Sequence, residues 1–250
     1  MHYFFGTIDK EKNIALLEND EAHHCAVVLR MNVGDTIGIL SPSENEGKIF
    51  KARLVNVHKK QCVAEIIEQQ LFQLPVFKSH LVISPPKNNE RLEWIVEKSV
   101  ELQVSSLLFV KSDRCIRKTL NIERLNNISL SAAKQSANPV LLKIEEVRSL
   151  GSIKNFIHTE NNVYLLLHCY PTSKINLSLD FIAQVQNEKK RNIYVFIGPE
   201  GDWTEEEVDW MKQNFHPLFE IDLGKTRLRT ETAAIQMASV LRILNASVSE

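Results

Sequence analysis

The feature that most constrains the fold of this chain is a local design that occurs twice in its last third. Residues 192–204 and residues 218–232 each begin as a short apolar strand, continue into a glycine-containing loop and end where a helix opens. In open α/β sheets, ligands bind beyond the carboxyl ends of the strands, where such loops lie side by side. Two adjacent loops of this kind therefore predict a pocket for a small molecule.

The alternation of strand and helix extends back to about residue 80. Residues 81–84 and 106–110 have the composition of buried strands, and residues 90–103 between them carry apolar side chains at helical spacing. This is a βαβ unit, which implies parallel pairing and a right-handed crossover. A helix over residues 122–137 and a buried strand over residues 163–168 continue the pattern, so the fold class is α/β.

The N-terminal part of the chain has a different pattern, in which short apolar alternation is broken by turn residues. One helical segment, residues 21–31, interrupts it, with Ala22, Cys25, Val28 and Leu29 expected on one face. Residues 69–75 have little periodicity and end in a proline that disfavours helix. We therefore predict a small β-rich domain over residues 1–72 and a larger α/β domain over residues 73–250.

Bulk composition narrows the class of protein. The chain has 250 residues, of which 44% are hydrophobic and 24% charged, and its formal net charge is -1, so only local clusters of cations are expected to attract a polyanion. The four cysteines are far apart and none has metal-ligand spacing, which predicts no metal site and a reducing, cytoplasmic compartment. Neither a signal peptide nor an apolar run long enough to cross a membrane is expected.

The loop of the first copy contains Gly198-Pro199-Glu200-Gly201, which taken alone is equally typical of a tight turn. Thr204 and Glu207 match a capping box, so the helix is expected to begin at Thr204. That leaves residues 198–203 as a loop of fixed geometry that permits close approach of the backbone to a ligand. Neither of the glycine-rich phosphate-binding motifs is present.

The loop of the second copy places Lys225, Arg227 and Arg229 within five positions, just before an apolar helix expected over residues 233–244. A solvated surface is the simplest explanation of such a cluster. Cations, however, oppose the positive end of the helix dipole, which favours anions. The arrangement therefore indicates an anionic substrate, with nucleic acid phosphate as the first candidate.

Three segments, residues 166–168, 197–201 and 223–233, resemble the cofactor-loop motifs of the RsmE family. These are small-subunit ribosomal RNA uridine N3-methyltransferases of the SPOUT superfamily. The resemblance covers nearly the whole chain in order, since it extends to residues 28–31, 96–102, 114–115 and 133–136.

The resemblance implies a PUA-like β-barrel that binds RNA, a SPOUT-type parallel sheet with a deep trefoil knot, and a homodimer with the active site at its interface. The three loops would wrap S-adenosylmethionine, with the adenine held mainly by backbone groups. The implied cofactor-binding residues are Leu167, His168, Ile197, Gly198, Pro199, Glu200, Gly201, Leu223, Gly224, Thr226, Leu228, Arg229 and Thr232. His168 is open to a second interpretation, as a hydrogen-bonded residue near the core.

The implied activity is methylation of N3 of a uridine in 16S ribosomal RNA, within the small ribosomal subunit. Loss of the N3 proton spreads negative charge onto the neighbouring carbonyl oxygens, and Arg229 is our candidate to stabilise it. An arginine cannot be the base, which leaves Glu231, or a water ordered by it, to accept the proton. A carboxylate that merely stabilises a helix N-terminus is an equal alternative for Glu231.

RNA contacts are expected from dispersed cations, each of which is individually typical of a solvated surface but which together would give salt-dependent binding. They are Arg30, Arg53, Lys59, Lys60, Lys111, Arg114, Arg117 and Lys118, with Gln135 beside them. Two departures from the family pattern stand out: Asp202 replaces a usual glycine, and Ala137-Asn138 replace a segment that usually carries an arginine. A SPOUT enzyme acting on transfer RNA and a non-catalytic ribosome assembly factor remain the alternatives.

Overall fold

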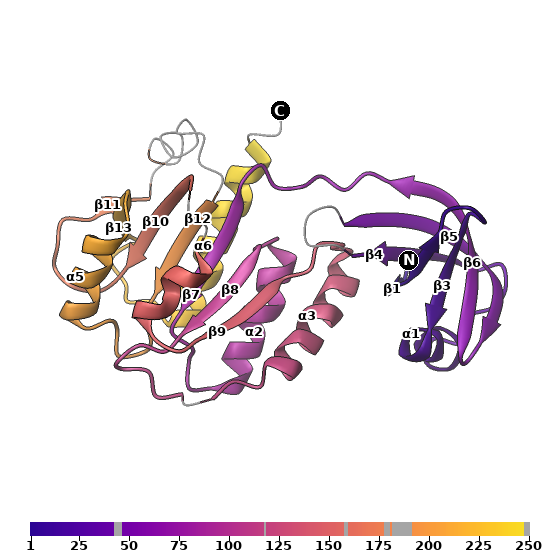
Figure 1. Ribbon diagram of the computed structural model, residues 1–250, viewed down its shortest axis with the longest axis horizontal. Helices are drawn as coiled ribbons and strands as arrows, with labels where there is room; N and C mark the ends of the chain where they lie inside the picture. The colour runs from indigo at the N-terminus through magenta and orange to yellow at the C-terminus, as the bar shows by residue number, and fades with distance from the viewer. Residues whose placement is uncertain (43–46, 118, 158–159, 178–180, 182–191, 248–250) are drawn as a thin grey trace. The chain divides into compact units, whose positions relative to one another are not determined.

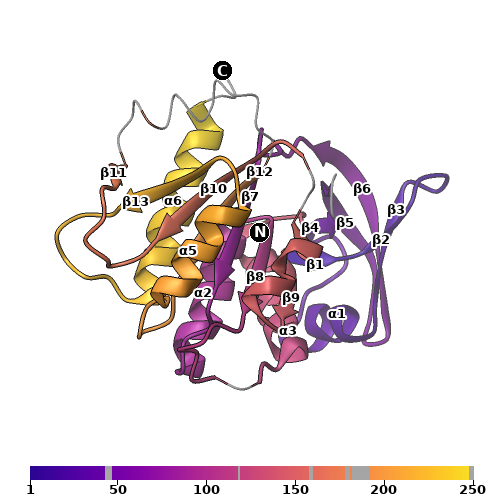
Figure 2. The same ribbon diagram turned by 60° about the vertical axis from the view of Figure 1, so that its left-hand side comes forward.

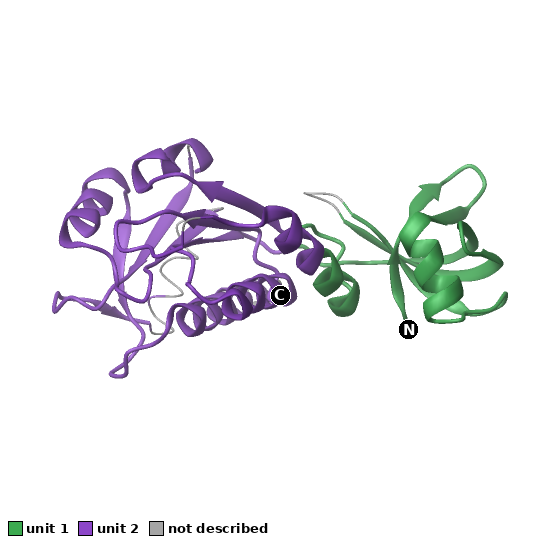
Figure 3. Cartoon of the chain, turned by 90° about the horizontal axis from the view of Figure 1, so that it is seen from below, with its two compact units in different colours: residues 1–74, 130–141 green, residues 75–129, 142–250 purple. Residues whose placement is uncertain are grey.

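The computed structural model describes residues 1–42, 47–117, 119–157, 160–177, 181 and 192–247, and it divides into two compact units. Unit 1 comprises Met1–Leu74 and Leu130–Leu141, and unit 2 comprises Pro75–Ser129 and Leu142–Glu250 (Figure 3). The smaller unit therefore draws on two stretches of sequence, one of which interrupts the sequence of the larger unit.

Unit 1 is built on a six-stranded sheet in the order β1-β4-β5-β6-β3-β2 (Figure 1). Only the pair β1 and β4 is parallel, and the other neighbours are antiparallel. Apolar side chains that alternate along these strands meet in one core around Phe4, Leu17 and Ile39, all fully buried. The strands are β1 (Tyr3–Phe5), β2 (Thr7–Asp9), β3 (Ile14–Glu18), β4 (Thr36–Ser41), β5 (Lys48–His58) and β6 (Gln61–Gln70).

The helical segment of unit 1 differs from the expected regular helix. It consists of α1 (Asn19–His23) followed by a π-helical turn, η1 (His24–Val28). In that turn the backbone N–H of Leu29 donates to the carbonyl of His24, five residues back, at 2.9 Å. The wider turn changes which side chains face the core, so Val28, expected on the same face as Ala22 and Cys25, is 60% exposed whereas both of those residues are buried. The prediction for Val28 was wrong for this reason.

Unit 2 is built on a seven-stranded sheet in which every pair of neighbours is parallel, in the order β11-β13-β10-β12-β7-β8-β9. The strands are β7 (Lys78–Ile83), β8 (Ser106–Val110), β9 (Lys143–Val147), β10 (Asn162–Leu167), β11 (Ile175–Asn176), β12 (Asn192–Ile197) and β13 (Leu218–Asp222). Every residue of β8, β10 and β12 is buried. Burial on both faces is the reason that their sequences are continuous apolar runs.

Helices cover both faces of this sheet (Figure 2). On one face, α2 (Asn89–Glu101) packs against α6 (Thr230–Ser247), and α6 also contacts β7 and β12. On the other face, α5 (Glu205–Asn214) and the 3-10 helix η2 (Leu150–Phe156) share a core with Tyr194 and Phe196 of β12. A further long helix among the described residues is α3 (Ile122–Ser136), whose last turns belong to unit 1.

Two features of unit 2 differ from what local sequence predicts. Helix α6 begins at Thr230, three residues before the expected start, which brings Glu231 into its first turn. The strands of the two similar segments, β12 and β13, are not neighbours, because β10 lies between them and pairs with both.

The trefoil knot stays a prediction. Within the described parts of the chain, no helix is long and apolar enough to span a membrane.

Candidate functional site

A cavity of about 670 Å³ lies at the carboxyl ends of β10, β12 and β13. Its walls are the loops that follow these three strands, the start of α6 and the side chain of Arg91 from α2. The two loops singled out in the sequence therefore do meet, although a third loop, after β10, lies with them. Of the residues implied to bind cofactor, the cavity is lined by Leu167, His168, Ile197, Gly198, Pro199, Glu200, Leu223, Gly224, Thr226, Leu228 and Arg229, whereas Gly201, Thr232 and the catalytic candidate Glu231 do not line it.

The loop after β12 folds tightly back on itself at Gly198. A Cβ atom at this position would lie 3.1 Å from both the Asp202 Oδ1 and the Trp203 backbone nitrogen, so a larger residue would displace the loop. The hydroxyl of Thr230 donates to the carbonyl of Gly198 at 2.9 Å, which fastens this loop to the start of α6. The predicted capping box is confirmed, with reciprocal bonds between Thr204 and Glu207.

Asp202, which replaces the usual glycine, has the backbone conformation that favours glycine, with φ of 64°. Its carboxylate compensates through two hydrogen bonds from backbone N–H groups. Oδ2 accepts from Cys169 at 2.7 Å, and Oδ1 accepts from Trp203 at 2.9 Å. Asp202 therefore joins the loop after β10 to the loop after β12, both of which line the cavity.

The loop after β13 turns at Gly224, whose φ of 116° is rarely accessible to other residues. The Asp222 side chain accepts the Gly224 N–H at 2.9 Å and so fixes the turn. Nothing lies within 4 Å of the position that a Cβ atom of Gly224 would take, so its backbone faces open space. An accessible backbone edge of this kind suits a flat heterocycle.

His168, at the end of β10, has both ring nitrogens engaged. Its Nδ1 accepts the Tyr170 N–H at 3.2 Å, so Nε2 carries the proton and donates to Glu220 at 2.6 Å. Burial lowers the pKa of His168 and outweighs the opposing hydrogen bond to Glu220, which keeps the ring neutral. Burial also raises the pKa of Glu220, but hydrogen bonds from Lys212, Thr172 and His168 outweigh it and lower that pKa overall. The ring of His168 thus connects the loop after β10 to Glu220 of β13.

Five cations among the described residues line the cavity. Lys225, Arg227 and Arg229 are exposed residues of the loop after β13, as the sequence predicted. Lys174, which was not predicted from the sequence, donates to the backbone carbonyl of His168 at 2.7 Å. Arg91 was missed as well, because nothing in the first turn of α2 signals that it faces loops so distant in sequence.

Arg91 forms an ion pair with Glu231, in which Arg91 Nε lies 3.2 Å from Glu231 Oε1. The side chain of Arg91 is 33% exposed and that of Glu231 is 11% exposed. The other carboxylate oxygen of Glu231, Oε2, is buried and has no hydrogen-bond partner among the described residues. The carboxylate of Glu231, which the sequence suggested as a base, is therefore already paired with Arg91, a cation that lines the cavity.

Two residues expected at the RNA surface also form hydrogen bonds within unit 2. Arg114 donates to the carbonyl of Gly201 at 2.9 Å and to that of Trp203 at 3.2 Å, so it braces the loop after β12. Arg117 donates to the carbonyls of Pro86 and Lys87, at 2.8 and 2.6 Å. These bonds leave each guanidinium with further donors for RNA. Their contribution to RNA binding stays a prediction.

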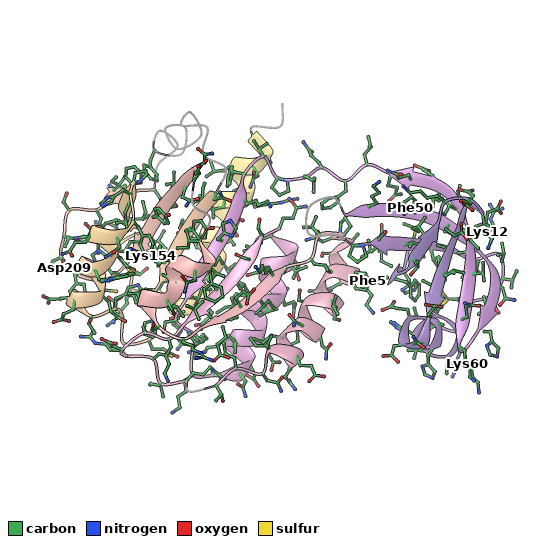
Figure 4. All side chains as sticks on the ribbon, in the orientation of Figure 1. Phe5, Lys12, Phe50, Lys60, Lys154 and Asp209 are labelled. Carbon is green, nitrogen blue, oxygen red and sulfur yellow. The ribbon has the colours of Figure 1, made fainter. Side chains whose placement is uncertain are left out.

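The other expected RNA contacts lie at the surfaces of both units. Arg30, Arg53, Lys59 and Lys60 are exposed in unit 1, as Figure 4 illustrates for Lys60, and Gln135 is exposed near the end of α3. Lys111 is exposed in unit 2, and Lys118 lies outside the described residues. The second departure from the family pattern, Ala137-Asn138, ends α3: Ala137 has φ of 53° and buried Asn138 accepts the Val140 N–H at 2.9 Å. In the part of the chain that the structure describes, no group of three His, Cys, Asp or Glu residues is placed to hold a metal ion.

The comparisons with known proteins match both units. Residues 73–242 match the family model of an RNA methyltransferase domain, and residues 17–67 match that of an RNA methyltransferase PUA domain. The chain belongs to this RNA methyltransferase family. The RsmE resemblance is thereby confirmed, as is the α/β fold with a PUA-like N-terminal part.

Individual relatives of the family align along most of their length. The chain is 27% identical over 234 residues to the ribosomal RNA small subunit methyltransferase E of Bacillus subtilis, covering 90% of this chain and 88% of that one. It is 24% identical over 249 residues to the protein of the same name from Rickettsia conorii, covering 99% and 97%. A solved structure from Legionella pneumophila, described as a methyltransferase in complex with its cofactor SAM, is 25% identical, with a TM-score of 0.77 over 97% of this chain and 96% of that one.

Proposed function

We propose that this RNA methyltransferase uses S-adenosylmethionine to methylate N3 of a specific uridine in 16S ribosomal RNA, within the small ribosomal subunit. The observation that carries the proposal is the cavity itself, in which three loops of the methyltransferase domain meet beside Arg229. The names of the relatives support the ribosomal substrate. We further propose that the chain acts in the cytoplasm as a homodimer, with residues 1–72 as the RNA-binding domain and residues 73–250 as the SPOUT domain.

The cavity fits the proposed cofactor. Its volume of about 670 Å³ lies within the range of pockets that bind small molecules and cofactors. The open backbone at Gly224 and the apolar side chains of Leu223, Leu228 and Ile197 would hold the adenine between them. When bound, S-adenosylmethionine supplies an electrophilic methyl carbon, and the electrons of the broken carbon–sulfur bond stay on its sulfur.

The residues of the chain would position the uridine and stabilise the charge that it develops. N3 of uridine becomes nucleophilic only as it loses its proton, and the resulting negative charge spreads onto the two neighbouring carbonyl oxygens. Arg229 is exposed at the cavity wall, immediately before α6, and in this proposal its guanidinium donates to one of those oxygens. Positioning and charge stabilisation, rather than a strong base, would account for most of the rate enhancement.

The proton acceptor follows from the position of Glu231. Because this residue does not line the cavity and one of its oxygens is paired with Arg91, direct abstraction of the N3 proton by Glu231 is disfavoured. We propose that a water accepts the proton. Glu231 would then contribute by orienting the groups around that water.

The decisive experiment offers labelled S-adenosylmethionine to purified small ribosomal subunits, free ribosomal RNA and bulk transfer RNA in parallel, followed by nucleoside mass spectrometry. N3-methyluridine formed only with ribosomal substrate is the expected result. Label in transfer RNA would overturn the substrate and favour a transfer RNA methyltransferase. Cofactor binding without label in any RNA would favour a non-catalytic assembly factor.

A further inference from the structure

Arg91 enters the cavity from a distant part of the sequence. Among the described residues that line the cavity, it is the only one that precedes β10. It lies in the first turn of α2, where its backbone N–H donates to the side chain of the N-cap residue Asn88 at 3.2 Å. The helix start thus fixes the backbone from which the guanidinium reaches the cavity.

The guanidinium itself is oriented by Glu231. The ion pair engages Nε of Arg91, which leaves its two terminal nitrogens free of hydrogen bonds to the described residues. Because Glu231 is nearly enclosed and Arg91 is one-third exposed, the pair presents the arginine, and not the carboxylate, to the cavity. Glu231 therefore acts on the cavity through Arg91.

The other arginines of the cavity have a different electrostatic setting. Arg227 and Arg229, like Lys225, form no ion pair with any described residue. An unpaired cation attracts a permanent anion such as a phosphate or a carboxylate. A guanidinium whose charge is balanced by a carboxylate attracts such an anion less strongly, but its N–H donors can still serve a ligand that is neutral when it binds and gains charge only during the reaction.

Uracil is such a ligand, and the charge that it gains is shared by two carbonyl oxygens. The charge released at N3 spreads onto O2 and O4, which flank N3 on either side. One guanidinium that bridged both oxygens would block the approach of the methyl group to N3. One guanidinium can therefore serve only one of the oxygens, and Arg229, proposed above to serve one, leaves the other for a second donor.

We propose that Arg91 is this second donor and that Glu231 is its positioning residue. The terminal nitrogens of Arg91 donate to one uracil carbonyl oxygen while Arg229 serves the other. The N3–H bond breaks with its electron pair left on the base, the proton passes to water, and the electron pair forms the bond to the methyl carbon. This inference rests on the proposed function, because it assumes uridine N3 as the nucleophile.

The test compares Arg91→Met with Arg124→Met under single-turnover conditions with small ribosomal subunits. Arg124 is a matched control, since it also forms an ion pair, with Glu93 at 2.6 Å, but on the surface of α3 away from the cavity lining. We expect Arg91→Met to lower the rate by about 10²–10³-fold, as for loss of one oxyanion donor. The affinity for S-adenosylhomocysteine, measured by calorimetry without RNA, is expected to change less than about twofold.

A pH profile separates this role from a structural one. Without Arg91 the bound uridine is less acidic, so the rate of the variant should keep rising at pH values where the wild-type rate has levelled off. Arg91→Lys, which keeps the charge and loses the planar fork, should show a smaller shift in the same direction and a smaller loss of rate. Adding Glu231→Gln to Arg91→Met should cost nothing further, because both act as one unit.

Three results would overturn the inference. They are an unchanged rate in Arg91→Met, an unshifted pH profile, or a loss of S-adenosylhomocysteine affinity as large as the loss of rate, which would assign Arg91 to the carboxylate of the cofactor. Failure of the proposed function is distinguishable, since the wild-type protein would then form no N3-methyluridine at all.

Discussion

Asp202→Gly restores the residue that the RsmE pattern leads one to expect, and the structure predicts that it destabilises unit 2. The substitution removes both hydrogen bonds that the carboxylate accepts, from the N–H groups of Cys169 and Trp203. It also removes the strain of a side chain at φ of 64°. These two effects have opposite signs, so their magnitudes decide the outcome.

The hydrogen bonds are the larger effect. A hydrogen bond to a charged group contributes about 1.5–3 kcal/mol, and because Asp202 is half-buried we take the lower end, which gives about 3 kcal/mol for the two. Relief of the left-handed conformation returns roughly 1 kcal/mol, and the greater freedom of glycine in the unfolded chain cancels about 0.5–1 kcal/mol of that gain. The net expectation is a loss of about 2.5–3 kcal/mol in the free energy of unfolding.

Urea unfolding followed by tryptophan fluorescence measures this loss in the right unit, because Trp94, Trp203 and Trp210 all belong to unit 2. Asp202→Asn is the matched control. It tolerates the same backbone conformation and keeps one acceptor oxygen, so it should lose only about half as much, roughly 1–1.5 kcal/mol. Equal urea midpoints for wild-type protein and Asp202→Gly would show that the two bonds contribute nothing net and would refute the reasoning.

Three further predictions concern the same unit and its surface. Burial holds the pKa of folded His168 below its ordinary value, so the unfolded chain binds more protons than the folded protein as the pH falls below about 6.5, and the free energy of unfolding should fall with the pH. The melting temperature of His168→Gln should therefore depend less on pH over this window than that of the wild-type protein. An equal dependence would contradict the assignment. Thr230→Val removes the bond to the Gly198 carbonyl and should cost about 1 kcal/mol, with weaker binding of S-adenosylhomocysteine in calorimetry; unchanged affinity would mean that this bond does not shape the cavity. Arg53→Met should reduce the slope of log affinity for RNA against log salt concentration by about one unit. Arg114→Met, which loses its bonds to the loop after β12, should also weaken the affinity for the cofactor. Identical behaviour of the two variants in filter binding and calorimetry would argue against a bracing role for Arg114.

Signals from residues close in sequence were sufficient to predict most of the helices and strands. The capping box at Thr204 and Glu207, the buried strands β8 and β12, and the turn at Gly224 all follow from residues that are close in sequence. Their hydrogen bonds and backbone conformations form within one turn or one strand, so neighbouring residues specify them. The π-helical turn after α1 escaped prediction because its i to i+5 bond leaves no distinct periodicity in so short a segment.

Contacts between distant residues could not be predicted in the same way. Nothing in the sequence near β12 and β13 indicates that β10 lies between them, because strand order is set by packing of the whole sheet. The same applies to the pairing of Arg91 with Glu231 and of His168 with Glu220. The sequence by itself determined the class of fold, the loops that build the site and the family, since these depend on periodicity and short motifs. Only the tertiary structure decided which cations reach the cavity and which carboxylates hold them in place, because those partners are brought together by the order of strands in the sheet and by helices packed across it.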